Sequence, residues 1–268
     1  MGSMLSQVTD APTLRPPRIV VHGKGGVGKT TFGASAPNPI LMPIEDGEGI
    51  LSVPHLPRPE SFVDVLNTLG ELFNDEHDYR TLVVDAIDKI EPMVWEQVYE
   101  GTKWDNIEAF GGGYSKGYKV ADQHWVKFFR WLDALRTKGM TTIIVAHNHT
   151  KNFEDPIIGA HIRTAPKLHD RANALLYEWA DVVGCLEIER MAQDRGDARV
   201  TRTAQTTGQR ILYLEDTGAV AAKNRYSLPP TLMIPKENGY AVLRSEIVKA
   251  LGLDKPAKAT TTAGEAAA

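Results

Sequence analysis

The residues best suited to chemistry form a glycine-rich stretch at 23–30, directly after the apolar run 19–21. It fits the phosphate-loop pattern G-x-x-x-x-G-K-[ST] at each fixed position. Glycines allow successive backbone N–H groups to point at phosphate oxygens, where a Cβ would block the approach. Lys29 adds a positive charge, and the Thr30 hydroxyl is a ligand for Mg²⁺. We predict an ATP and Mg²⁺ site whose cofactor-binding residues are Gly23, Lys24, Gly25, Gly26, Val27, Gly28, Lys29, Thr30 and Thr31.

A second ligand for the metal is expected at the end of the apolar strand 81–85. In phosphate-loop enzymes an aspartate in this position, here Asp85, holds the Mg²⁺ water shell beside the loop threonine. The next residue is Ala86, so the carboxylate that activates water must come from elsewhere. The apolar run 40–44 ends in Glu45, which we predict to be the general base. Two neighbouring acids, Asp46 and Glu48, remain alternatives for that role.

Another apolar strand, 141–146, ends in His147 and Asn148. Ligands of open α/β sheets lie at the carboxyl ends of the strands, so either side chain is placed to sense the γ-phosphate of ATP. We therefore count His147 with Lys29 and Glu45 among the candidate catalytic residues. A zinc site built from His147 and later histidines lacks the cysteine or carboxylate spacing that such sites show.

One segment combines glycines with aromatic and basic side chains. Residues 111–119 contain three glycines, then tyrosines interleaved with lysines. This composition suits a mobile loop that stacks bases and pairs with phosphates of single-stranded DNA, although a plain flexible connection has the same glycine content. The predicted DNA contacts in it are Tyr114, Lys116, Tyr118 and Lys119. A second long polar segment, 150–168, is broken by prolines and a glycine and is also expected to be a functional loop.

The candidate site residues follow apolar strands, and these strands must alternate with helices to bring their ends to one edge of a parallel sheet. Amphipathic or apolar-periodic segments at 62–74, 87–100 and around 125–135 separate the apolar runs. We therefore predict an α/β fold: a P-loop NTPase core with a mostly parallel twisted sheet flanked by helices. Later segments are predicted to be strands at 181–188 and 210–215, a turn at 194–197 and a helix at 245–251. We also predict a C-terminal antiparallel β extension of the sheet.

The expected domain covers residues 18–252. Residues 1–17 are predicted to be a disordered leader whose first three residues resemble a vector-derived tag, and 253–268 a disordered tail. The formal net charge of −4 excludes a wholly basic nucleic-acid coat and leaves room for local basic patches. The single cysteine, Cys185, lies in an apolar run and is expected to be buried. With no apolar run of membrane-spanning length, we expect a cytoplasmic protein with no membrane partner.

Several motifs together resemble the phage-encoded RecA-like P-loop ATPases of single-strand annealing and recombination. The resemblance spans about residues 18–235. The matching pieces are the phosphate loop, Glu45-Asp46-Gly47, the Asp85 strand, Gly117-Tyr118, Ala146-His147, Pro166-Lys167-Leu168-His169, Glu178-Trp179-Ala180-Asp181 and Ala222-Lys223-Asn224-Arg225-Tyr226.

The resemblance implies a RecA-like core with ATP bound between subunits of a ring or filament. It also implies that DNA is held by the loops at about 101–119 and 150–168, the second contributing Lys151, Arg163 and Lys167. Lys223 and Arg225 would then reach the γ-phosphate of a neighbouring subunit as catalytic residues supplied in trans. The implied partners are single-stranded DNA, further copies of the chain and a single-strand-binding protein, in the cytoplasm of a bacterial host if the chain is phage-encoded.

Two other functions compete with this interpretation. Lys24 inside the loop is also typical of partition and division-site ATPases, in which this lysine reaches the nucleotide of a dimer partner. Those proteins usually carry Asp-x-Asp and Asp-x-Pro after the second and third strands, where this chain has Glu45-Asp46-Gly47 and Asp85-Ala86-Ile87. The third possibility is an assembly protein that binds ATP without hydrolysing it.

Overall fold

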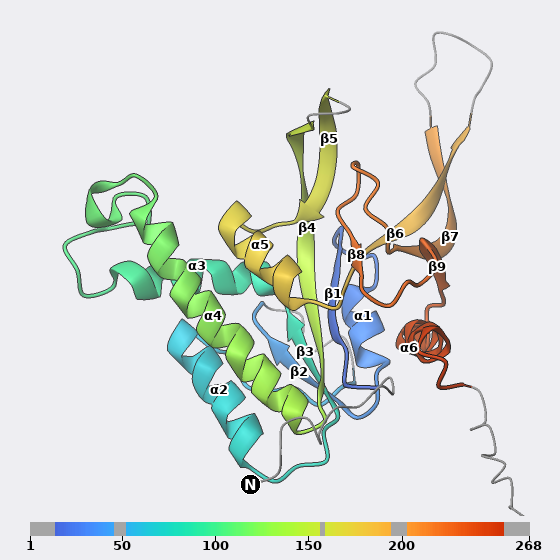
Figure 1. Ribbon diagram of the computed structural model, residues 1–268, viewed down its shortest axis with the longest axis horizontal. Helices are drawn as coiled ribbons and strands as arrows, with labels where there is room; N and C mark the ends of the chain where they lie inside the picture. Colours follow the sequence, from blue (N-terminus) through green and yellow to red (C-terminus); the bar gives the residue numbers. More distant parts are fainter. Residues whose placement is uncertain (1–13, 46–51, 156–158, 194–202, 255–268) are drawn as a thin grey trace, which may run out of the picture.

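The apolar runs of the sequence form the centre of one twisted sheet in the computed structural model, which describes residues 14–45, 52–155, 159–193 and 203–254 (Figure 1). Five strands pair in parallel in the order β2–β3–β4–β1–β6. Parallel strands are buried on both faces, which explains why these segments are apolar without alternation. Their bounds are β1 (Arg18–Gly23), β2 (Pro39–Pro43), β3 (Thr81–Asp85), β4 (Thr141–Asp155) and β6 (Val182–Gln193).

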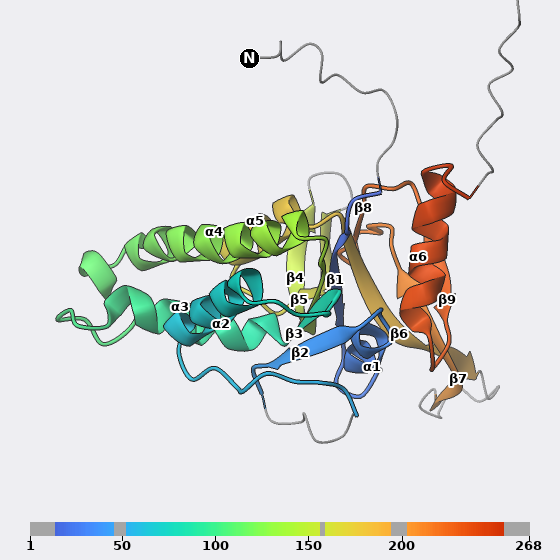
Figure 2. The same ribbon diagram turned by 90° about the horizontal axis from the view of Figure 1, so that it is seen from below.

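Helices cover both faces of this sheet (Figure 2). One face carries α2 (Phe62–Asn74), α3 (Ile87–Tyr99), α4 (Lys116–Thr137) and α5 (Asp170–Trp179). The other carries α1 (Lys29–Ala34) and α6 (Gly239–Ala250). Each layer buries its own apolar cluster against the strands. The predicted α/β class, with a mostly parallel sheet flanked by helices, is confirmed.

Two helices show why the sequence periodicity was informative. Ser61 caps α2 by accepting a hydrogen bond from the Asp64 backbone N–H, and the Asp64 side chain accepts from the Ser61 N–H in return. In α4 the aromatic and leucine side chains at helical spacing are buried, as expected for core residues. Those side chains are Trp125, Phe128, Phe129, Leu132 and Leu135.

The predicted loop at 150–168 is wrong. β4 continues past the sheet edge to Asp155, and β5 (Gly159–Pro166) returns antiparallel to it. The register runs from Asn148 opposite Pro166 to Asp155 opposite Gly159. The ladder satisfies the backbone groups, so this polar segment is stable as a β-hairpin that projects beyond the parallel strands (Figure 1).

The glycine-rich segment also differs from the prediction. A 3₁₀ turn, η3 (Phe110–Gly112), leads into α4, which begins at Lys116. Lys116, Tyr118 and Lys119 therefore lie on a helix and not on a mobile loop. Gly117 allows this helix start to pack closely, because a Cβ there would lie 2.2 Å from the Ile107 carbonyl oxygen.

The C-terminal part extends the sheet with antiparallel strands, as predicted. They are β7 (Thr203–Tyr213), β8 (Lys223–Asn224) and β9 (Thr231–Ile234). The predicted turn at 194–197 lies outside the described residues, as do residues 1–13 of the leader and 255–268 of the tail. α6 begins at Gly239, ahead of the predicted start at residue 245, because Tyr240 and Leu243 pack into the core.

Cys185 is buried, as predicted, and burial raises the pKa of its thiol to about 12. Within the described ranges, no helix is both long enough and apolar enough to cross a membrane.

Candidate nucleotide site

The phosphate loop connects the carboxyl end of β1 to α1. Lys24, Gly25 and Gly26 are exposed, whereas Val27 and Lys29 are buried. Gly26 has a φ of +75° and Gly28 a φ of +101°, a backbone conformation that favours glycine. At Gly28 a Cβ would also lie 2.9 Å from the Arg210 Nε atom. The loop therefore has the curled backbone that the sequence pattern requires.

Lys29 is held inside the curl of the loop. Its Nζ donates hydrogen bonds to the carbonyl oxygens of Gly23, at 3.0 Å, and Lys24, at 2.9 Å. Burial lowers the pKa of Lys29, while the charges of Asp85, Asp88 and Glu45 raise it. The ammonium is already in place beside the loop N–H groups, so it can contact phosphate oxygens with little rearrangement.

Thr30 and Asp85 meet although their strands are not neighbours. β4 lies between β1 and β3, and the start of α1 carries Thr30 across to Asp85. The Thr30 hydroxyl donates to Asp85 Oδ2 at 2.5 Å. Burial raises the pKa of Asp85, and this hydrogen bond opposes the rise. A hydroxyl and a carboxylate oxygen are the hard ligands that Mg²⁺ prefers, so the pair fits the predicted metal.

Glu45 and His147 complete this edge of the sheet. Pro43 pairs with Asp85, and Gly23 pairs with His147, and β3 and β4 are themselves paired, so the four strand ends lie along one edge. Glu45 Oε1 lies 3.5 Å from His147 Nε2, and its Oε2 lies 3.6 Å from Lys89 Nζ. The structure thus brings the candidate base and the candidate sensor together. The alternative bases Asp46 and Glu48 lie outside the described residues.

Two residues of this region were not predicted from the sequence. Arg210, on β7, donates its Nε–H to the Val27 carbonyl oxygen at 2.8 Å and so supports the phosphate loop. Asp88, in the first turn of α3, is buried and contacts His147. For Asp88, a weak signal was available: an acid one helical turn after a strand-end aspartate lies near the same site.

Lys223 and Arg225 lie at the opposite, amino edge of the parallel strands. β8 pairs with the first residues of β6, Val182 and Val183. Lys223 donates to the Tyr177 carbonyl oxygen, and Arg225 donates to Asp181 at 3.2 Å. Both residues therefore lie away from the phosphate loop of their own chain, which follows the carboxyl end of β1.

The predicted DNA contacts divide into exposed and engaged side chains. Tyr114 is 91% exposed, and Lys119 and Lys167 are also exposed. Lys116 is exposed too, but its Nζ donates to the Gly111 carbonyl oxygen at 2.9 Å. Tyr118 instead stacks on His169, with ring centroids 4.0 Å apart. The hairpin side chains Lys151 and Arg163 form ion pairs with Asp170 and Asp216.

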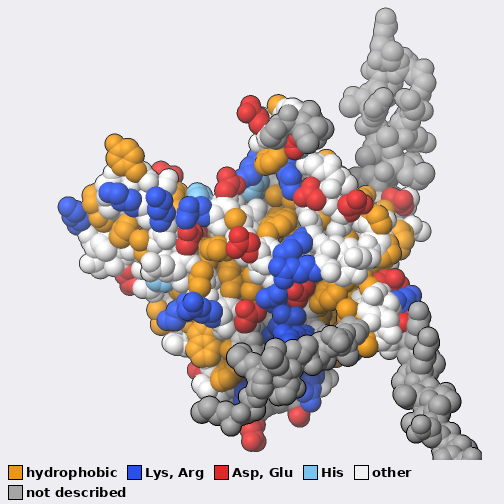
Figure 3. Space-filling view, viewed as in Figure 1, with side chains coloured by type: hydrophobic (Ala, Val, Ile, Leu, Met, Phe, Trp, Pro, Cys, Tyr) orange, Lys and Arg blue, Asp and Glu red, His pale blue; other side chains and the backbone are white. Residues whose placement is uncertain are grey.

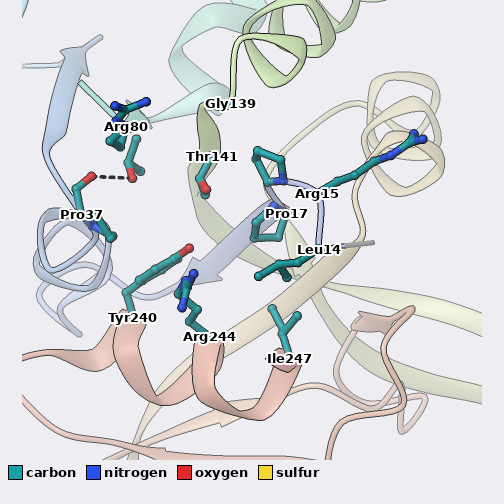
Figure 4. Close-up of a pocket in the computed structure, with 12 residues that line it drawn as sticks. Leu14, Arg15, Pro17, Pro37, Arg80, Gly139, Thr141, Tyr240, Arg244 and Ile247 are labelled. Atoms are coloured by element: carbon teal, nitrogen blue, oxygen red, sulfur yellow. Dashed lines mark hydrogen bonds between the residues drawn. The ribbon is translucent and has the colours of Figure 1, made fainter. Parts of the chain in front are cut away.

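A cavity of about 230 Å³ lies elsewhere, at the amino edge of the sheet. Figure 4 shows Tyr240, Arg244 and Ile247 of α6 facing Leu14 and Pro17 across it. It is far from the strand ends that carry the phosphate loop. Across the part of the chain that the structure describes, no group of three or more His, Cys, Asp or Glu side chains is arranged to hold a metal ion.

The comparison with known families agrees with this geometry. A family model described as an AAA domain matches residues 15–226. The chain belongs to this AAA-domain family. The match includes all five parallel strands, the phosphate loop and Asp85. The AAA domain is a P-loop NTPase core that binds nucleotide. No curated protein matches the chain.

Proposed function

We propose that this AAA-domain protein is an ATP-dependent, single-stranded-DNA-binding recombination protein of the phage RecA-like type, acting by annealing or strand pairing. The observation that carries the proposal is the course of β4. The strand passes His147 at the nucleotide site and continues without a break into the hairpin that carries Lys151. Nucleotide contacts at His147 are therefore linked through one strand to a projecting element suited to a partner.

The position of Lys223 and Arg225 supports hydrolysis between subunits. Both cations lie at the amino edge, whereas the phosphate loop lies at the carboxyl edge. In a ring or filament that stacks unlike edges, the cations of one copy would approach the ATP and Mg²⁺ of the next. Such residues stabilise the charge that develops on the transferred phosphoryl group. A single-strand-binding protein belongs to the same proposal as a further partner.

The DNA track of this proposal follows α4. Lys116, Lys119, Lys127 and Arg130 are exposed at helical spacing on this helix. None of the ion pairs formed by the described residues includes any of the four. Figure 3 shows Lys and Arg side chains gathered at the upper left, where Figure 1 draws the first turns of α4. Repeated along an oligomer, such faces would line a positive groove despite the negative charge of each chain.

The decisive experiment measures steady-state ATP hydrolysis in Mg²⁺ and low salt, with long single-stranded DNA, with duplex, and without DNA. We expect stimulation by single strands above duplex, and a loss of that turnover in Lys223→Ala with ATP binding retained. Stimulation by duplex alone would favour the partition-type switch. ATP binding without turnover under all conditions would favour the non-catalytic assembly protein.

The α4 lysines provide a direct test of the DNA track. In a Lys116→Ala/Lys119→Ala variant we expect weaker single-strand binding. Fewer lysines then neutralise phosphates, so binding releases fewer counterions from the DNA. The slope of log K against log salt should flatten by about 0.7 per lost contact. Binding titrations over a range of salt concentrations measure this slope. Lys236→Ala, at an exposed lysine beyond β9, is the control. Equal affinity and slope in the double variant and the control would exclude this face.

A further inference from the structure

Helix α3 links the predicted metal ligand to the candidate sensor. It begins at Ile87, two residues after Asp85 at the end of β3. Its first turn carries Asp88, whose side chain is only 3% exposed. A carboxylate is rarely buried this deeply unless it has several hydrogen-bond partners. The groups that Asp88 contacts therefore indicate its role.

Asp88 holds His147 at two points. Its Oδ1 accepts a hydrogen bond from the His147 backbone N–H at 2.9 Å. The His147 ring nitrogen Nδ1 lies 3.2 Å from Oδ1 and 3.1 Å from Oδ2. The carboxylate thereby fixes both the end of the parallel part of β4 and the orientation of the imidazole ring.

The same contact requires a proton on the ring nitrogen Nδ1. An ionised carboxylate only accepts hydrogen bonds, so Nδ1 must donate to Asp88. The other nitrogen, Nε2, then faces Glu45 Oε1 at 3.5 Å. Asp88 therefore contacts His147, and His147 in turn contacts Glu45, at the carboxyl edge of the sheet. Asp88 itself is separated from the candidate base by the imidazole ring.

We propose that Asp88 is a positioning residue for ATP hydrolysis: it holds the His147 ring with a protonated Nδ1, so that Nε2 is presented to Glu45. This inference rests on the proposed ATPase site. Asp88 acts through His147 and contacts no nucleotide. A misplacement of about 1 Å at a reacting group can lower a rate on the order of 100-fold, so the orientation of this ring is sufficient to affect turnover strongly.

The same helix provides a matched control. Glu91 lies one turn after Asp88 and is also buried. It accepts the backbone N–H of His169, the N-cap residue of α5, at 2.9 Å, and burial raises its pKa to about 7. Glu91 therefore resembles Asp88 in burial, helix and type of partner. The difference is that its hydrogen-bond partner, His169, caps α5 and is not a member of the pair formed by His147 and Glu45.

The kinetic test compares Asp88→Asn with Glu91→Gln, both measured without DNA. Asparagine keeps an oxygen for the His147 backbone N–H but no longer dictates the protonation of Nδ1. We expect kcat to fall on the order of 100-fold in Asp88→Asn, with the Kd for ATP unchanged. Glu91→Gln should keep the wild-type kcat. In a His147→Ala background the Asp88→Asn change should have little further effect, because the ring through which Asp88 acts is gone. An equal loss in both backgrounds would overturn the proposal in favour of a purely structural role.

A second readout does not depend on turnover. Long-range ¹H–¹⁵N spectra of the full-length protein report which nitrogen of His147 is protonated, and the His147→Ala variant identifies its signals. We expect a protonated Nδ1 in the wild type and in Glu91→Gln, and a changed pattern in Asp88→Asn. An unprotonated Nδ1 in the wild type would overturn the inference. Absence of ATP hydrolysis by the wild type would contradict the proposed function alone, because the ring spectrum decides the role of Asp88 independently.

Discussion

Replacing Lys29 by alanine is expected to abolish productive nucleotide binding. The substitution removes a buried ammonium that already lies on the loop carbonyls of Gly23 and Lys24. Loss of one partner from a buried, hydrogen-bonded charge pair costs about 2–5 kcal/mol. An affinity loss of roughly 30-fold to several thousand-fold should follow, with turnover lost as well. Calorimetric titration with ATP and Mg²⁺ measures the first, and a phosphate-release assay the second.

Lys24→Ala is the matched control for this variant. Lys24 belongs to the same loop, but its side chain is exposed, and a contact of its backbone N–H with phosphate would survive the substitution. We expect Lys24→Ala to bind and hydrolyse ATP nearly as the wild type does. Wild-type turnover in Lys29→Ala would refute the assignment of the phosphate site. Loss of turnover in Lys24→Ala, with binding retained, would instead favour the dimer switch in which this lysine acts across an interface.

The parts of the fold that local sequence controls were predictable. The phosphate loop, the buried strands and the α2 cap depend on residues that are close in the chain. The convergence of Glu45, Asp85 and His147 was predictable as well, because parallel strands present their carboxyl ends at one edge. The sequence pattern did not predict which groups each of these side chains contacts, because those contacts depend on how the whole chain packs.

The β4–β5 hairpin shows the limit of periodicity. Beyond Ala146 both faces of the ribbon leave the sheet, so burial no longer imposes an alternation of apolar and polar residues. The strand there is stabilised by backbone hydrogen bonds to β5, and these bonds do not depend on the type of side chain. The start of α4 was missed for a related reason. Gly117 counts against a helix in the sequence, yet close contact with the Ile107 backbone requires a residue without a Cβ.

Arg210 and Asp88 were missed for a third reason. Arg210 reaches the phosphate loop from a strand 183 positions further along the chain. Asp88 is engaged with a backbone N–H and a ring nitrogen of His147, and neither contact leaves a motif. Both residues support groups that the sequence did identify. Sequence patterns therefore gave the residues predicted to face the nucleotide, and the structure added the residues that hold them.

Replacing Glu45 by glutamine should separate ATP binding from hydrolysis. Glutamine keeps the size of the side chain and its contacts with His147 and Lys89, but it cannot accept a proton from water at neutral pH. A positioned general base contributes about 100- to 10,000-fold to a rate, so kcat should fall by that factor. The Kd for ATP should change little, because the loop residues Lys29 and Thr30 remain in place. Single-turnover hydrolysis and equilibrium binding, measured on the same sample, give the two quantities.

Glu187→Gln provides the comparison for this prediction. Glu187 lies on β6 beside the exposed part of the phosphate loop, where it lines a small cavity with Lys24, Gly25 and Gly26. Its removal changes the charge near the nucleotide by the same amount as Glu45→Gln but at the far side of the loop. A general electrostatic effect would lower turnover in both variants. A loss confined to Glu45→Gln would identify a base at the Asp85 side of the site. Wild-type turnover in Glu45→Gln would transfer the role to Asp46 or Glu48, the acids that follow it in the chain.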